Sequence, residues 1–275
     1  YNRLIKQKLD NVTFATVTYD AFSRIDHVDY QAGISLQPAL RDSLGRTNKV
    51  TYRVSGQDIT DEVTRSTSGL VMSGTENGVN KSYSYDKADR LLGATIGNDV
   101  FTYGFDTSSA TCSSLSGNNQ NAGKDGNRTS YTLNGATTTY CYNMADQLIA
   151  SSDSRFAQVG YDSHGNITRL GDETHKTEFG YDISDRNVNI KETTSSGNRE
   201  TTYQRDSGDR IYHRSYKVNG VAQDNSYYGF TSSADSPSFL TDTNGTVTQK
   251  YLNLVGGIKV TIKTQSTSAN ATTYS

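Results

Sequence analysis

The feature that most constrains this chain is a short phrase that recurs along it. The phrase begins with Tyr-Asp, passes through a short polar link to Gly or Asp and then Arg or Asn, and ends on an aliphatic residue. In the best-preserved stretch, from Tyr142 to Tyr203, the period is about twenty residues, which suits a strand, a turn and a return strand but is too short for a βαβ unit. The residues assigned to the motif are Tyr19, Asp20, Arg24, Tyr85, Asp86, Arg90, Tyr142, Tyr161, Asp162, Asn166, Tyr181, Asp182, Arg186, Tyr203 and Arg210.

Each copy of the phrase predicts a β-hairpin with the motif at its turn. Upstream residues alternate, so that Tyr83 and Tyr85 fall on one face of a strand. Asp and Asn suit the turn because their side chains bond the backbone two residues on, and Gly or Asn tolerates positive φ. Degenerate copies begin at Asp42, Lys124 and Thr241. Since no window shows helical spacing with an N-cap and a terminal Gly, we expect an all-β fold without helices.

Composition favours a sheet that is thin or hollow. Only 33% of the 275 residues are hydrophobic, Trp is absent, and 19 Tyr outnumber 8 Phe. This amount of aliphatic material cannot fill one large core. The net charge is only -2 and β-favouring residues recur throughout, which argues against a disordered chain.

The charge balance and the apolar pattern exclude two classes of partner. With 27 basic and 29 acidic residues, the chain has no positive field to attract nucleic acid. The apolar patch at Leu252–Ile258 is broken by Asn253 and glycines, and no other run is long enough to cross a bilayer. We therefore expect no nucleic-acid partner and no membrane span in this segment.

A polar segment at 106–140, rich in Ser, Asn and Gly, interrupts the array of repeats. Its composition predicts an irregular loop that projects from the scaffold. Cys112 and Cys141 bracket it, and a disulfide between them would contribute roughly 2–4 kcal/mol by restraining the unfolded loop. Two unrelated buried thiols are the alternative, because spacing does not show that two sulfur atoms meet. If the bond forms, the compartment is oxidising.

The recurring phrase resembles the tyrosine-aspartate (YD) repeat of RHS-type proteins. The same repeat occurs in wall-associated polymorphic toxin carriers, in the B and C components of insecticidal Tc toxins and in animal teneurins. In that family the hairpins wind as a spiral strip into a large hollow β-shell. The likeness extends from Tyr19 to Arg210, and it implies that residues 1–275 are one YD-repeat shell segment of a longer chain.

The resemblance also implies a function. In bacterial members the shell encloses a toxic C-terminal domain, which a core segment releases by aspartate-dependent self-cleavage. After Tyr251 this chain has neither the Asp-Pro-Gly core motif nor a toxin, so self-cleavage is not assigned to it. We expect a secreted or cell-surface structural shell whose partners are the rest of its own chain and a C-terminal toxin or effector. The alternative is a teneurin-like adhesion scaffold that binds a receptor or glycan through the Cys-bracketed loop.

No catalytic, cofactor-binding or metal-binding site is predicted. Asp86, Asp162 and Asp182 occupy the same position of the repeat, and this position recurs from unit to unit. We therefore expect these aspartates to stabilise the turns and not to act as acids or bases. None of the four His has a partner at metal-ligand spacing, and nucleophile-elbow and phosphate-loop motifs are absent. The segments 242–246 and 124–127 lack the acidic series of a calcium loop, which favours turns. A repeat-built polysaccharide enzyme would need a site that the sequence does not show.

Tyrosines outside the motif are the candidates for a surface role, because exposed aromatic rows stack on sugars and anchor interfaces. Tyrosines inside the motif are instead expected to pack laterally between neighbouring hairpins. The candidates outside the motif are Tyr30, Tyr131, Tyr227 and Tyr228.

Overall fold

The computed structural model describes residues 3–106, 109–264 and 271–274, which lie mostly in antiparallel β-strands joined by short turns. The all-β prediction is confirmed. The strands of the first half are β1 Lys6–Leu9, β2 Val12–Tyr19, β3 Ile25–Tyr30, β4 Ile34–Leu36, β5 Leu40–Arg41, β6 Thr47–Val54, β7 Gln57–Arg65, β8 Val71–Glu76, β9 Val79–Tyr85, β10 Leu91–Ile96, β11 Asp99–Gly104, β12 Ser130–Leu133, β13 Ala136–Tyr142 and β14 Leu148–Ser151. Those of the second half are β15 Val159–Tyr161, β16 Ile167–Gly171, β17 Lys176–Tyr181, β18 Asn187–Thr194, β19 Gly197–Arg205, β20 Ile211–Val218, β21 Val221–Gly229, β22 Phe239–Thr241, β23 Val247–Asn253, β24 Lys259–Lys263 and β25 Ala271–Tyr274.

Helical structure is limited to single turns. An α-helix, α1, spans Ala110–Ser113, and two 3-10 helices, η1 and η2, span Gln31–Gly33 and Ser154–Phe156. The expectation of a chain without helices is therefore wrong, because α1 forms one turn of α-helix. It lies inside the polar segment that interrupts the repeats. No helix among the described residues is long and apolar enough to cross a membrane.

The strands follow one another in chain order through two sheets. The first sheet has 14 strands, β1 to β14, with β5 paired to β6 at its side. The second has 11 strands, β15 to β25. Within the described residues, the ladder of main-chain hydrogen bonds passes from each strand to the next and is interrupted between β14 and β15.

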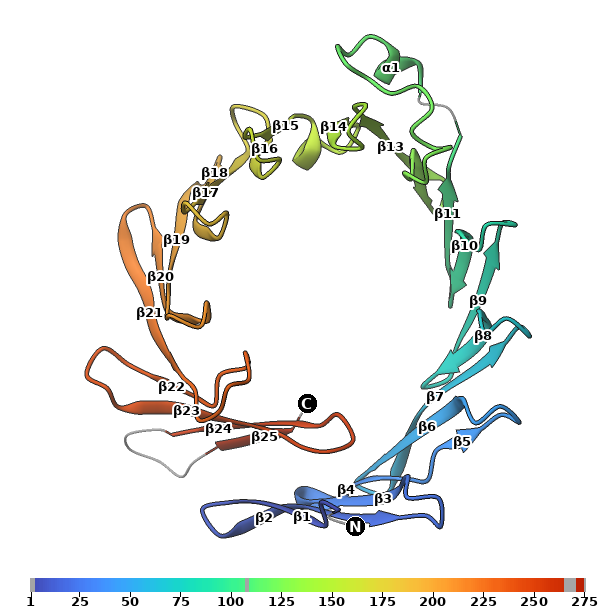
Figure 1. Ribbon diagram of the computed structural model, residues 1–275, viewed down its shortest axis with the longest axis vertical. Helices are drawn as coiled ribbons and strands as arrows, with labels where there is room; N and C mark the ends of the chain where they lie inside the picture. The colour runs from blue at the N-terminus through green and yellow to red at the C-terminus, as the bar shows by residue number, and fades with distance from the viewer. Residues whose placement is uncertain (1–2, 107–108, 265–270, 275) are drawn as a thin grey trace.

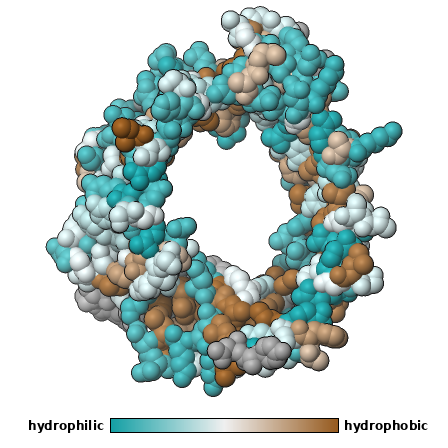
Figure 2. Space-filling model, viewed as in Figure 1, coloured by the Kyte–Doolittle hydropathy of each residue, from teal (hydrophilic) through white to brown (hydrophobic). Residues whose placement is uncertain are grey.

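The two sheets curl into a ring around an open centre (Figures 1 and 2). The ends of the strip overlap, with β24 and β25 on the central side of β1 to β4 (Figure 1). The main hydrophobic core lies in this overlap and joins the two ends. Its buried members are Phe14, Ala15, Val17, Val28, Tyr30, Leu254 and Val260.

Local irregularity helps to fill this core. Gln7 pairs with Ala15 and Lys8 with Thr13, so Phe14 is the extra residue of a β-bulge in β2. The bulge allows Phe14 and Ala15, which are neighbours in sequence, both to be buried, at 6% and 1% exposure. Elsewhere in the ring most apolar side chains are only half-buried, as a wall one sheet thick requires.

Strand alternation assigns the motif tyrosines to the inward face of the ring. Val17 pairs with Val28, and both side chains belong to the core between β1 to β4 and the strands on their central side. The face of β2 that carries Val17 therefore points inward. Tyr19 lies two residues from Val17 and shares its face. In the second sheet the outward-facing Val260 belongs to the overlap core, and the registers from β24 back to β21 place Tyr228 on the opposite, inward face.

The turns gather on two rims of the strip. One rim, the motif rim, carries the turns at 20–24, 42–46, 66–70, 86–90, 143–147, 162–166, 182–186 and 206–210. The opposite rim carries two-residue turns such as Asn77-Gly78 and Asn219-Gly220, in which both residues have positive φ (45° and 82°, 48° and 78°). This is the type I′ geometry, which matches the twist of paired strands and favours Asn-Gly.

Candidate functional site

The motif-rim turns share one hydrogen-bonded geometry, which turn 182–186 illustrates. The Asp182 Oδ1 accepts hydrogen bonds from the backbone N–H groups of Ser184 (2.9 Å) and Arg186 (3.1 Å), and its Oδ2 accepts one from the Arg186 Nε (2.8 Å). These bonds, led by that of the Arg186 side chain, lower the pKa of Asp182 to about 2. The same bonds, to the residues two and four places later, recur at Asp20, Asp42, Asp86, Asp162 and Asp206.

The fourth residue of each turn takes a left-handed backbone conformation. Its φ is 60° at Asp89, 58° at Asp185 and 68° at Asp209, and Gly45 and Gly165 take the same place in other turns. Gly reaches this region without a steric penalty, and Asp and Asn reach it more readily than other residues. This requirement explains why the motif has Gly or Asp at that position.

The motif tyrosines join each turn to the one before it. The Tyr181 hydroxyl donates a 2.8 Å hydrogen bond to the backbone carbonyl of Ile167, which directly follows turn 162–166. The bond therefore connects two hairpins that are successive on the motif rim. Equivalent bonds run from Tyr19 to Leu4 (2.9 Å), from Tyr85 to Val71 (2.8 Å), from Tyr142 to Arg128 (3.1 Å) and from Tyr161 to Leu148 (2.9 Å).

The last copy of the motif has a different register from the expected one. Asp206 and Arg210 form its turn, so Arg205 stands at the tyrosine position and Tyr203 lies two residues earlier in β19. The Arg205 Nη2 donates to the carbonyl of Asn187 (3.2 Å), which follows turn 182–186 as Ile167 follows its own turn. Arg205 thus replaces the tyrosine, and Tyr203 does not belong to the turn.

Side chains at the turn tips add a second set of links along the rim. The Arg186 Nη1 donates to the Asp209 Oδ1 (3.1 Å) of the next turn. The Asn166 Nδ2 donates to the Asp185 Oδ1 (2.9 Å), and His164 pairs with the same carboxylate at 2.7 Å. In both cases the acceptor is the residue with left-handed φ, so the motif positions act on neighbouring units as well as on their own.

One turn on this rim escaped the sequence pattern because it contains neither Tyr nor Asp. In turn 66–70 the Ser66 Oγ accepts from the Leu70 N–H (3.1 Å), and Gly69 has φ of 102°. Arg65 stands at the tyrosine position, and its Nη1 donates to the Gly69 carbonyl (3.2 Å). The Arg-Ser pair followed by Gly three residues later is the signal that could have identified it.

The irregular insertion is shorter than the sequence indicated. Residues 130–140, expected to belong to the loop at 106–140, form β12 and most of β13, which pair with each other and with β11. Among the described residues, the irregular segment therefore covers 105–106 and 109–129. Residues 130–140 resemble a loop in sequence because both strands are rich in Ser and Thr. Asn134 and Gly135 form the two-residue turn between them.

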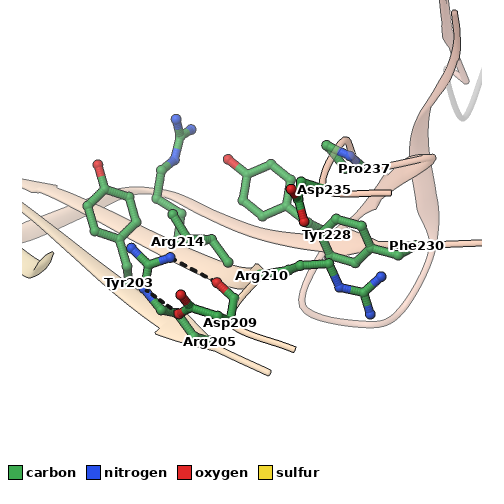
Figure 3. Close-up of a pocket in the computed structure, with 10 residues that line it drawn as sticks. Tyr203, Arg205, Asp209, Arg210, Arg214, Tyr228, Phe230, Asp235 and Pro237 are labelled. Atoms are coloured by element: carbon green, nitrogen blue, oxygen red, sulfur yellow. Dashed lines mark hydrogen bonds and ion pairs between the residues drawn. The ribbon is translucent and has the colours of Figure 1, made fainter. Parts of the chain in front are cut away.

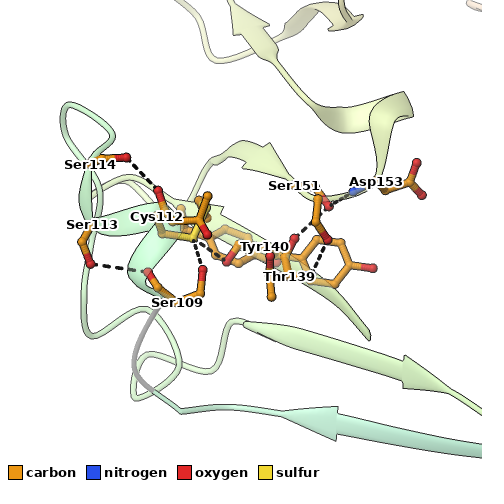
Figure 4. Close-up of a disulfide and its surroundings, with 12 residues drawn as sticks. Ser109, Cys112, Ser113, Ser114, Thr139, Tyr140, Ser151 and Asp153 are labelled. Atoms are coloured by element: carbon orange, nitrogen blue, oxygen red, sulfur yellow. Dashed lines mark hydrogen bonds between the residues drawn. A yellow bond between two sulfur atoms is a disulfide. The ribbon is translucent and has the colours of Figure 1, made fainter. Parts of the chain in front are cut away.

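A disulfide between Cys112 and Cys141 ties the insertion to the wall (Figure 4). Cys112 lies in α1 and Cys141 in β13, and the two residues are 0% and 4% exposed. The backbone N–H of Asn119 also donates to the carbonyl of Tyr142 (2.7 Å). The disulfide and this bond fix the loop to its base, while α1 projects beyond the ring (Figure 1).

The insertion begins with a structure that occurs twice. The Arg90 guanidinium lies 4.4 Å from the centre of the Phe105 ring, and its Nη1 donates to the Gly123 carbonyl (2.9 Å). In the second sheet the Arg210 guanidinium lies 4.3 Å from the centre of the Phe230 ring, and its Nη1 donates to the Ser232 carbonyl (2.8 Å). Both phenylalanines end the tripeptide Tyr-Gly-Phe, a repeated signal that the sequence interpretation overlooked.

The loop after Phe230 forms one wall of a pocket of about 570 Å³ (Figure 3). Tyr203, Arg214 and Tyr228 project side by side from three adjacent strands on the inward face. Asp235 and Pro237 lie in the loop on the other side.

The charges of this pocket are largely satisfied within the protein. Arg210 pairs with Asp206 at 2.8 Å, and Arg214 pairs with Asp224, which raises the pKa of Arg214. Arg205 donates to the carbonyls of Asp209 and Asn187. Because the guanidinium groups are bound to protein partners, the pocket offers chiefly phenol and apolar surface, and it contains no paired acid and base aimed at a common point.

The tyrosines expected to have a surface role lie in different environments. Tyr30 is 6% exposed and belongs to the overlap core, so its proposed surface role is wrong. Tyr131 lies beside Tyr103, and the Arg128 guanidinium lies over both rings, at 5.6 and 5.3 Å from their centres. The remaining two candidates are Tyr227, stacked on His213 at 4.3 Å, and Tyr228 in the pocket.

The residues considered for metal binding are arranged as parts of turns. Asp242 accepts hydrogen bonds from the N–H groups of Asn244 and Thr246, both at 2.9 Å, as the other turn aspartates do. No group of three or more His, Cys, Asp or Glu that could hold a metal ion occurs among the residues that the structure describes.

Comparison with known proteins gives structural likenesses only. No family model and no curated protein matches the chain. A crystal structure of TcdB2-TccC3-Cdc42 aligns with a TM-score of 0.48 and 12% identity over 96% of this chain and 16% of that one. The Tc holotoxin pore of Photorhabdus luminescens, carrying a mutation in TccC3, gives 0.47 and 12% over 94% and 15%. A porin-like protein from Bacteroides uniformis gives 0.27 and 13% over 88% and 95%.

Proposed function

We propose that this chain is a wall segment of a secreted or cell-surface shell that encloses or displays a C-terminal toxin or effector. The observation that carries the proposal is the ring itself, a strip one sheet thick outside the overlap of its ends (Figure 1) that surrounds an open centre (Figure 2). Most of its apolar side chains are half-buried, and its main core joins the ends of the strip. The resemblance of the repeats to those of YD shells supports the same role.

The stabilising interactions suit a container wall. Within each sheet, neighbouring hairpins are bonded by the strand ladder, and motif tyrosines such as Tyr181 and turn pairs such as Arg186 with Asp209 add further links. These contacts are between neighbours, as in other repeat architectures, so the wall can extend by adding units. Catalysis is not part of the proposal, since no described cluster combines a nucleophile, a base and an oxyanion-stabilising group.

The test uses the full-length parent protein, purified from the culture medium of its own host. Its mass is measured under denaturing conditions and its size under native conditions, before and after protease treatment. A C-terminal fragment that is already cleaved, co-elutes with the shell and resists protease until the shell is denatured is the expected result. A C-terminal domain digested at the same rate in native and denatured protein would overturn the container proposal.

The insertion supports a second candidate, attachment to a receptor or glycan. The loop that carries α1 projects beyond the ring (Figure 1) and is held by the Cys112–Cys141 disulfide, an arrangement that suits a presented binding loop. The bond also supports the proposed extracellular location, because disulfides persist in oxidising compartments. Replacing 113–125 with a Gly-Ser linker should abolish cell attachment under this proposal and leave cargo protection unchanged. Attachment that survives the replacement would reject the second candidate.

A further inference from the structure

The ring is built as two sheets that meet at two junctions without a strand ladder. Within each half, adjacent strands are joined by main-chain ladders. The halves meet at β14 and β15, where the ladder is interrupted, and again at the overlap of the strip's ends. A sheet cannot bend sharply without breaking ladder hydrogen bonds, so we expect movement between the halves to occur at the junctions, the second of which also holds the overlap core.

The first junction has the properties of a hinge. The N–H of Ser152 bonds to Thr139 in the first half, and the Gln158 carbonyl accepts from Gly171 in the second. Between these anchors, η2 is bonded mainly within itself, through Asp153 and Arg155. Its bonds can persist while the halves rotate.

The space beside η2 leaves room for such movement. A cavity of about 370 Å³ lies between η2 and strands β16 to β18. On the motif rim, the 2.9 Å bond from the Tyr161 hydroxyl to the Leu148 carbonyl links the two halves. It lies at the edge of the strip and leaves η2 free to turn.

The second junction has the properties of a latch. The turn 254–258 lies against the inward face of the first strands, where the Tyr30 hydroxyl donates to the Val255 carbonyl (2.7 Å) and the Tyr52 hydroxyl donates to the Gly256 carbonyl. The Gln7 side chain bonds the Asn253 carbonyl (3.1 Å) and the Val255 N–H (2.7 Å). These side chains bond the turn and the end of β23. The Lys250 ammonium also pairs with Asp10 at 2.7 Å, and apolar contacts of the overlap core complete the joint.

Gly256 makes the latch sensitive to small changes. Its φ is 86°, and a Cβ at this position would overlap the Tyr30 hydroxyl and come within 2.9 Å of Leu36. The turn therefore approaches the first half as closely as a glycine permits. Separation at this joint breaks no strand ladder, whereas separation anywhere inside a sheet does.

We propose that the ring opens like a clamp, by parting of the turn 254–258 from Tyr30 and Tyr52 while the two sheets rotate about the segment 152–158. The motion parts the wall along the whole width of the strip. The proposal rests on the absence of a strand ladder at both junctions, and the motion also separates the apolar contacts of the overlap core.

The test measures distances by double electron–electron resonance on the full 275-residue chain. Spin labels at Val12→Cys and Asn244→Cys report across the overlap. Labels at Val79→Cys and Val100→Cys, both on exposed positions of the first sheet, are the matched control. The latch is weakened by Tyr30→Phe with Tyr52→Phe, which removes two hydroxyl donors and keeps the rings in the core.

The expected result is a second, longer distance across the overlap, in more than roughly 10% of the weakened molecules, with the control pair unchanged. Hydrogen exchange should then accelerate at 153–157 and stay slow in β18 to β20. A single unchanged distance across the overlap would overturn the proposal. So would equal broadening of the control pair, or faster exchange spread through the first sheet, because either would show general loosening in place of a hinge.

Discussion

The Tyr181 hydroxyl reaches back across fourteen residues to the carbonyl of Ile167, and this 2.8 Å bond fastens one repeat turn to the turn before it. Four other motif tyrosines make the same bond, and Arg205 makes it where the tyrosine is absent. The phrase that recurs in the sequence therefore encodes a connection between units as well as a turn. Stability along the strip should depend on these connections one by one.

Tyr181→Phe should lower the free energy of unfolding by about 1 kcal/mol, because it removes one hydrogen bond and leaves the ring in place. Urea unfolding followed by circular dichroism measures the change. Tyr212→Phe is the control, since its hydroxyl bonds Gln204 within the same hairpin and its side chain is 38% exposed. Equal effects of the two variants would contradict a special role for the inter-turn bond.

The turn aspartates should make the wall sensitive to acid. The pKa of Asp182 is lowered from 3.8 to about 2 in the fold, chiefly by the Arg186 side chain. Its stabilising effect is therefore complete above about pH 4 and is lost as the pH falls through about 2. Asp172, with a pKa of about 2 set first by the Thr174 hydroxyl, should act in the same window.

The Asp182→Asn variant tests this dependence. It should be less stable than the wild type at pH 5 and equally stable near pH 2, as judged by urea midpoints across the series. Asp235→Asn, which removes an aspartate outside the turn network, should show no such convergence. A difference between Asp182→Asn and wild type that stays constant from pH 5 to pH 2 would rule out the ion-pair explanation.

Reduction of the Cys112–Cys141 bond should lower the free energy of unfolding by about 3.6 kcal/mol, as chain entropy predicts for a loop closed over 29 residues. Protease should then cut first within 105–129, since the loop loses its covalent attachment to β13. Thermal melting and peptide mapping with and without reductant measure both effects. The Cys112→Ser, Cys141→Ser double variant should not respond to reductant. Labelling of both thiols in the native, unreduced protein would refute the bond.

Two glycine substitutions separate backbone strain from crowding at the latch. Gly220→Ala should cost about 1 kcal/mol, because its φ is 78° and no atom lies within 4 Å of the added Cβ. Gly256 has a similar φ of 86°, but the Cβ added by Gly256→Ala would also overlap Tyr30. This overlap should cost about 1 kcal/mol more. Urea midpoints compare the two. Equal losses would mean that the latch tolerates an added methyl group.

The sequence by itself determined the repeat unit. An aspartate that bonds the residues two and four places later, and a left-handed residue between them, are contacts within five positions of the chain. Such contacts depend on the local backbone, so the pattern predicts them directly. The alternation that assigns Tyr83 and Tyr85 to one face is local in the same sense. For this reason the all-β fold and the position of most turns follow from the residues.

Tertiary structure alone decided how the strip closes. Tyr30 meets Val255 across 225 residues, and it changed from a candidate surface residue to a core residue. Small twists between many successive strands add up to the curvature, and no single segment encodes that sum. Pairing with distant neighbours likewise decides three other features. These are the interrupted ladder after β14, the register of Arg205 and the strand at 130–133. Such pairing is set by packing across the whole ring, which a local pattern does not contain.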